Sequence, residues 1–147
     1  MSTAIHRRVA ACREGSDPTL IARLPSGWAV MGDPQVLNGY CLLLPDPVVP
    51  HLNAMTPRAQ AIFLADLARL GQAVLELTGA LRINYALFGN LEPALHAHVH
   101  PRFADEPDAL RTAHPWAYDW SAARRFDPAR DGALLEALRA RLAAPAA

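Results

Sequence analysis

The sequence contains few cysteines, no long apolar run and no excess of charge of either sign. Two cysteines among 147 residues, Cys12 and Cys41, do not make a disulfide scaffold, so nothing demands an oxidising compartment. No apolar stretch approaches the ~18 to 20 residues that span a bilayer. Residues 1–15 also lack the apolar segment of a secretory signal. We therefore expect a cytoplasmic protein without a membrane partner.

The absence of net charge bears on possible partners. Lysine and arginine together number 14, and so do aspartate and glutamate, which gives a formal net charge of zero. Proteins that bind nucleic acid polymers usually carry a basic excess, because phosphate contacts drive that affinity. The sequence thus argues against a nucleic acid polymer as partner. Any recognition of phosphate is expected to be local, through a few donors in a pocket.

The size and composition are those of a single globular unit. Hydrophobic residues make up 52% of the chain and charged residues 19%, which excludes a disordered protein. The sequence has neither an internal repeat nor a low-complexity linker. We expect one domain over residues 1–147.

The clearest predicted element is a helix over residues 56–78. Thr56 suits the N-cap, Pro57 suits the first helical position, and Gly79 lies just past the end. Apolar residues recur along it at helical spacing. They are Ile62, Phe63, Leu67, Leu70, Val74 and Leu77. This stripe predicts a helix that packs across a sheet.

Shorter segments alternate or run apolar in ways typical of strands. The expected strands cover residues 19–24, 28–31, 39–44, 82–88 and 95–100, and further helices are expected over 4–14 and 128–142. The order is three strands, the long helix, two strands and a helical C-terminus. It predicts an α+β domain in which a long helix covers an antiparallel sheet.

Three of the six histidines alternate in one short run. His96, His98 and His100 would project from the same face of a strand, while Ala97 and Val99 would face a core on the other side. Three imidazoles this close are costly unless they stay neutral or meet something anionic. We therefore treat all three as candidate catalytic residues, and we expect their ligand to be phosphate or a metal ion.

Two other interpretations of the histidine run are a metal site and an exposed strand without a functional role. Imidazole is a common zinc ligand, and two same-face histidines can share one ion. A zinc site usually needs a further ligand, which His51 or His114 would supply only if the fold brings it near. In the third interpretation the three histidines are simply polar residues of an edge strand.

The segment His96–Arg102 resembles the histidine triad (HIT) family of nucleotide hydrolases and transferases. Three other segments support the likeness. Asn38–Pro45 looks like the family's Pro-Gly-His strand, Leu52–Pro57 looks like the entry to its long helix, and Ile83–Leu87 looks like the strand before the triad. The resemblance covers roughly residues 17–105, and residues 106–147 form a C-terminal extension.

This resemblance implies a fold and an activity. The fold is a HIT-like antiparallel sheet with a long helix across it and a helical C-terminal extension. The activity is cleavage of a phosphoanhydride, as in dinucleoside polyphosphates such as diadenosine tetraphosphate, or of a phosphoramidate, through a nucleotidyl-histidine intermediate. No cofactor or bound metal is required, although magnesium can arrive with the nucleotide substrate. Family members commonly pair as homodimers, and we expect the same here.

Two registers of the triad are open. If the three histidines fill the three family positions, His98 is the nucleophile. If the alignment is anchored on Pro101-Arg102, His98 takes the third position, His96 becomes the nucleophile, and the first position falls on Ala94. We prefer the second register. The absence of its first histidine also favours an alternative function, a nucleotide-binding protein with weak or lost catalysis.

Four further residues are candidates for binding the substrate. By resemblance, Asn84 or Asn90 would face the phosphate pocket. Arg102 could contact phosphate or make a structural salt bridge. Asp33 lies near the family's ribose-binding position, but a turn-capping role is the better interpretation.

Aromatic residues follow the histidine run. Trp116, Tyr118 and Trp120 form a stripe that could stack on a base, although packing of the C-terminal segment is the better interpretation.

Overall fold

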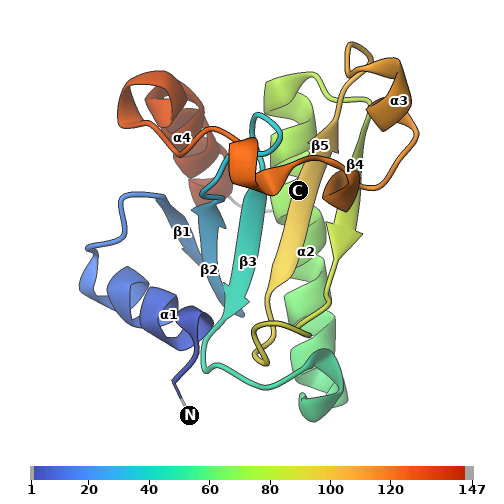
Figure 1. Cartoon of the computed structure of the whole chain (residues 1–147). Helices are drawn as coiled ribbons and strands as arrows, with labels where there is room; N and C mark the ends of the chain where they lie inside the picture. Colours follow the sequence, from blue (N-terminus) through green and yellow to red (C-terminus); the bar gives the residue numbers. More distant parts are fainter. Residues whose placement is uncertain (1, 145–147) are drawn as a thin grey trace.

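The computed structural model describes residues 2–144, which fold as one five-stranded antiparallel sheet with helices on both faces (Figure 1). The strand order is β1-β2-β3-β5-β4, with β4 at one edge. The elements are α1 (Ala4–Glu14), β1 (Leu20–Leu24), β2 (Gly27–Met31), β3 (Cys41–Pro45), η1 (Leu52–Ala54), α2 (Pro57–Thr78), β4 (Arg82–Ala86), β5 (Ala97–Arg102), α3 (Asp108–Arg111), η2 (Pro115–Ala117), η3 (Trp120–Ala122) and α4 (Pro128–Ala143). The predicted element order is confirmed.

Helix α2 begins and ends where its sequence predicts. The Thr56 hydroxyl accepts a hydrogen bond from the Ala59 amide at 3.2 Å, Pro57 occupies the first turn, and Gly79 ends the helix at φ 69°. A positive φ of this size favours glycine because it has no Cβ to clash with the backbone. Within residues 2–144, no helix is both long and apolar enough to cross a bilayer.

The inner face of α2 is narrower than the sequence predicts. Phe63, Leu67, Leu70 and Val74 are buried against the sheet, whereas Ile62 is 37% exposed. The four buried residues recur every three or four positions and so share one face, while a residue immediately before Phe63 is rotated by roughly 100° from it. The prediction that Ile62 faces the core is therefore wrong.

The two faces of the sheet differ in what covers them. Ala97 and Val99 of β5 face α2 and α4 and belong to the larger core. His98 is paired across the sheet with Leu42 of β3, and the two side chains share the opposite face. There Leu42 packs in a second core with Val9 of α1. The histidines therefore lie on the face that α1 covers in part.

A segment after α3 crosses that same face. In Figure 1 the chain between α3 and α4 passes in front of β5 and β3, opposite α2. Its course is anchored by the Gln35 amide, which donates to the Arg124 carbonyl at 2.8 Å. The segment and α1 thus cover two parts of the face and leave room for a cavity beside His96 and His98.

Candidate functional site

The three histidines lie side by side on one face, as the alternation predicts. Strand β5 begins two residues later than expected, so His96 directly precedes it while His98 and His100 belong to it. The ring centroids of His96 and His98 are 5.0 Å apart, and those of His98 and His100 are 5.7 Å apart. Ala97 and Val99 are fully buried on the opposite face. Beyond this point the three imidazoles differ.

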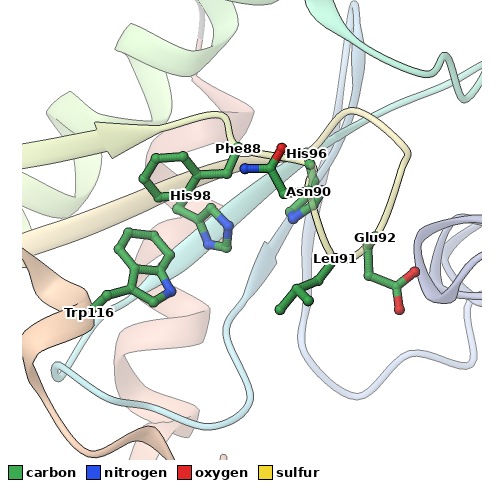
Figure 2. A pocket seen from close by; sticks show the side chains of 8 residues that line it. Phe88, Asn90, Leu91, Glu92, His96, His98 and Trp116 are labelled. Atoms are coloured by element: carbon green, nitrogen blue, oxygen red, sulfur yellow. The ribbon is translucent and has the colours of Figure 1, made fainter.

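His96 and His98 line an open cavity of about 480 Å³. Figure 2 shows the two imidazoles between the Trp116 side chain, from the segment after α3, and the loop that follows β4. The lining residues are Phe88, Gly89, Asn90, Leu91, Glu92, His96, His98 and Trp116. The loop is tied to α1, because the Glu92 carboxylate accepts a hydrogen bond from the Ala4 amide at 3.0 Å. The cavity has aromatic and apolar walls, and its polar side chains are two imidazoles, the Asn90 amide and the Glu92 carboxylate.

The orientation of His96 is set by the backbone. Its Nδ1 lies 2.7 Å from the carbonyl oxygen of Ala94. A carbonyl oxygen can only accept a hydrogen bond, so Nδ1 must carry a proton. In the neutral ring the lone pair then lies on Nε2. His96 therefore presents the nitrogen of a nucleophile or base.

The inner nitrogen of His98 has a different partner. Its Nδ1 lies 2.6 Å from the hydroxyl oxygen of Tyr40, the residue that precedes β3. Burial, with the nearby positive charge of His96 as a smaller cause, lowers the pKa of His98 to about 4. His98 is therefore neutral at physiological pH.

His100 is enclosed rather than presented to the cavity. It is 0% exposed and stacks on the Tyr40 ring, with ring centroids 4.4 Å apart and planes within 1°. Trp116 and Trp120 contact it edge-on. Burial above all lowers the pKa of His100 to about 3, and within residues 2–144 neither ring nitrogen has a hydrogen-bond partner. The structure thus does not bring this predicted catalytic residue to the cavity, because aromatic side chains cover it.

No protein-family model matches the sequence, and no curated protein matches it in a sequence comparison. Solved structures do match. A histidine triad protein from Bradyrhizobium japonicum superposes with a TM-score of 0.73 at 24% identity, over 88% of this chain and 93% of that one. A histidine triad protein from Marinobacter aquaeolei gives a TM-score of 0.76 at 17% identity, over 97% and 98%. The chain has the histidine triad fold.

A third match has a similar extent. A hypothetical histidine triad nucleotide-binding protein from Sulfolobus tokodaii superposes with a TM-score of 0.71 at 12% identity, over 92% of this chain and 90% of that one. The match extends the histidine triad fold across most of both chains.

The predicted substrate-binding residues do not all reach the cavity. Asn90 lines it beside the histidines. Arg102 is 5% exposed and forms an ion pair with Glu106 at 2.9 Å. The same guanidinium donates to the side-chain oxygen of Asn84 at 2.8 Å and to backbone carbonyls. Asn84 and Arg102 therefore belong to a partly buried polar network that borders a separate hollow, and this fits the structural salt bridge considered for Arg102.

Asp33 is also engaged elsewhere. Its carboxylate accepts hydrogen bonds from the Arg125 guanidinium at 2.7 Å and from the Phe126 amide at 3.0 Å. These bonds, with the Arg125 side chain as the main cause, hold the pKa of Asp33 below its usual range. In this chain Asp33 fastens the segment that precedes α4.

The two additional metal ligands considered from the sequence lie in separate hollows. His51 directly precedes η1 and lines one hollow with His96, and His114 lines another with His100. In the part of the chain from residue 2 to residue 144, no three histidine, cysteine, aspartate or glutamate side chains are placed to hold one metal ion.

Sequence reasoning missed Tyr40 and Phe88, and of the aromatic stripe that it singled out Trp116 lines the cavity. Tyr40 is 3% exposed and contacts both His98 and His100. One signal was present, since Tyr40 occupies the place of the histidine in the family's Pro-Gly-His segment. Phe88 and Trp116, whose ring centroids are 4.8 Å apart, form one wall of the cavity. Only the fold places them together.

Proposed function

We propose that this protein is a nucleotide hydrolase or transferase in which His96 attacks a phosphate of the substrate. The first substrates to test are dinucleoside polyphosphates such as diadenosine tetraphosphate, and then nucleoside phosphoramidates. The histidine triad fold and the nucleotide-binding name of the Sulfolobus tokodaii protein support a nucleotide as ligand.

One observation carries the assignment of the nucleophile. The Ala94 carbonyl holds the Nδ1 proton of His96, which leaves the Nε2 lone pair for the cavity. A neutral imidazole held in this tautomer is a competent nucleophile towards phosphorus. His98, by contrast, lies against a hydroxyl group, and His100 is buried. This difference supports the register in which His96 holds the central triad position.

The reaction proceeds in two displacements. Nε2 of His96 forms a bond to phosphorus while the bond from phosphorus to the leaving group breaks. A leaving phosphate departs as an anion, whereas the leaving amine of a phosphoramidate takes up a proton from solvent. Water then attacks the nucleotidyl-histidine, releases neutral His96 and loses its proton to solvent. His98 and Asn90 line the same cavity and supply N–H donors for the charge that develops on the phosphate oxygens. No metal ion is assigned a role, although magnesium can arrive with the nucleotide.

A nucleotide-binding protein with weak catalysis is the second candidate. The observation in its favour is Ala94, which stands where the resemblance expects the first triad histidine. Ala94 supplies its backbone carbonyl to His96 but has no side chain that could assist proton transfer.

A nucleotide panel tests these alternatives. Turnover of dinucleoside polyphosphates, phosphoramidates and nucleoside triphosphates is measured at fixed enzyme concentration, with and without a chelator. We expect turnover of at least one class that survives chelation and disappears in His96→Ala. Binding without turnover in the wild type would favour the second candidate. Turnover lost on chelation and restored by zinc would contradict both.

We also propose a homodimer that forms through the edge of the sheet. Within residues 2–144 one edge of strand β4 is unpaired. Leu81, just before the strand, is 59% exposed, and Tyr85, within it, is 45% exposed. Edge strands with exposed apolar side chains favour pairing with a second strand. Sedimentation of the wild type is expected to give a dimer, and Tyr85→Glu a monomer. A monomeric wild type at micromolar concentration would contradict the proposal.

A further inference from the structure

The Tyr40 side chain contacts the inner nitrogen of His98, one of the two cavity histidines. Its hydroxyl lies 2.6 Å from Nδ1 of His98, and its ring stacks on His100 and meets Trp120 edge-on at 5.5 Å. The residue is 3% exposed, so water does not compete for the hydroxyl group. The contacts with His98, His100 and Trp120 together fix the position of the Tyr40 side chain.

The direction of this hydrogen bond decides the tautomer of His98. If Tyr40 donates, Nδ1 of His98 holds a lone pair and Nε2 carries the proton. If His98 donates, the protonation is reversed and Nε2 has the lone pair of a nucleophile. The two arrangements give His98 opposite chemistry in the cavity.

The surroundings of the hydroxyl favour donation by Tyr40. The bond to His98 is the one hydrogen bond that this hydroxyl makes within residues 2–144. If Tyr40 accepted instead, its own O–H hydrogen would be buried without an acceptor, which is costly. Burial also raises the pKa of Tyr40 well above its usual value, so the hydroxyl keeps its proton.

We propose that Tyr40 is a positioning residue that holds His98 as a neutral Nε2–H donor facing the phosphate. The two neighbouring histidines then have opposite tautomers. The Ala94 carbonyl places the proton of His96 on Nδ1, and the Tyr40 hydroxyl places that of His98 on Nε2. One ring supplies a lone pair and the other an N–H group. The tautomer follows from the structure alone, while its use against phosphate rests on the proposed function.

Imidazole ¹⁵N NMR of the full-length protein tests the tautomer without any substrate. The signals of His98 are assigned by their loss in His98→Gln. In the wild type near neutral pH, we expect a protonated Nε2 and an unprotonated, hydrogen-bonded Nδ1. The opposite tautomer in the wild type would overturn the proposal, whatever the variants do.

The Tyr40→Phe variant tests the cause. It keeps the stacked ring and removes the hydroxyl, so we expect the Nδ1 signal of His98 to shift towards a mixture of tautomers. Tyr118→Phe is the matched control, because it removes a hydroxyl that donates to Glu106 at 2.7 Å and leaves His98 untouched. An unchanged His98 tautomer in folded Tyr40→Phe would overturn the proposal.

Activity gives the second readout. With a substrate that the panel identifies, Tyr40→Phe should lower kcat on the order of tenfold, the loss of one hydrogen bond, with little change in KM. A changed KM with unchanged kcat would contradict a positioning role. If the wild type shows the expected tautomer but turns over no nucleotide, the proposed function fails while the tautomer assignment stands.

Discussion

The two ends of the histidine run contain the same residue type on the same face of one sheet, yet they have opposite environments. His96, at the start of β5, faces a cavity and is oriented by a backbone carbonyl. His100, four residues later, is covered by Tyr40, Trp116 and Trp120 and makes no hydrogen bond through its ring within the described residues. Alternation along a strand determines which face a side chain takes. What packs over that face determines whether it can act.

This difference shows that the segment packed over the histidines is part of the site. The segment after α3 closes the His100 end and contributes Trp116 to the wall of the cavity at the other end. His98 lies between the two ends, with one nitrogen against Tyr40. The three similar residues of one motif therefore have three different environments.

The largest expected effect separates the two ends directly. His96→Ala should lower turnover on the order of 10⁴-fold or more, because it removes the nucleophile. His100→Leu should stay within several-fold of the wild type, because His100 does not reach the cavity. Steady-state turnover of the best substrate from the panel measures both. Equal losses in the two variants would erase the distinction between the ends.

Removing the buried ion pair of Arg102 and Glu106 is expected to lower the stability of the fold and to leave substrate binding unchanged. Arg102→Met leaves Glu106 buried without its partner, which should cost about 3–5 kcal/mol of unfolding free energy. The companion variant Arg102→Met/Glu106→Leu should recover most of that loss. Urea unfolding measures both, and KM should stay unchanged wherever the variant is folded. A stable Arg102→Met with a raised KM would instead assign Arg102 to the substrate.

Substitution of His98 should lower turnover less than substitution of His96 and more than substitution of His100. His98→Ala removes one donor to the charge on the phosphate, so turnover should fall on the order of 10²- to 10³-fold. The nucleophile remains, and single-turnover experiments should still detect a nucleotidyl-enzyme. If His98→Ala forms no nucleotidyl-enzyme at all, His98 and not His96 would be the nucleophile at the central triad position.

Counted per histidine and per pH unit, the smallest expected effect is the dependence of stability on pH. Burial keeps His98 and His100 neutral in the folded protein down to pKa values of about 4 and about 3, whereas in the unfolded chain they protonate near pH 6.5. The unfolded state therefore binds more protons below pH 6.5, and stability falls as the pH is lowered from there towards 4. Each histidine contributes up to about 1.4 kcal/mol per pH unit.

His100→Leu isolates the share of one histidine in that slope. In the variant, the slope of unfolding free energy against pH should fall by the share of one titrating group. The variant should also be more stable than the wild type at pH 5, since it removes two unpaired polar atoms from the interior. Urea unfolding between pH 4 and pH 8 gives the measurement. An unchanged slope in the variant would show that His100 titrates as an exposed residue does.

Much of the fold follows from local sequence signals. Thr56, Pro57 and Gly79 mark the ends of α2, and the alternation around His98 predicts which residues face the core. Ile62 shows the limit of such patterns, because apolarity alone does not say where the buried face of a helix ends. These signals depend on neighbours a few residues apart.

The site was less predictable because it depends on residues distant in sequence. Tyr40 meets His98 across 58 positions, and Asp33 is held by Arg125 across 92 positions. Neither pairing has a local signal. The histidine run indicated phosphate chemistry, whereas the roles within it depend on the segment that crosses the sheet.

Trapping the covalent intermediate tests the central claim most directly. The protein is mixed with a substrate labelled in the nucleotide, quenched in a way that preserves phosphohistidine bonds, digested and mapped by mass spectrometry. The account predicts one nucleotidyl group, on His96, in the wild type and in His98→Ala, and none in His96→Ala. Label on His98, or turnover in His96→Ala at the wild-type rate, would contradict it.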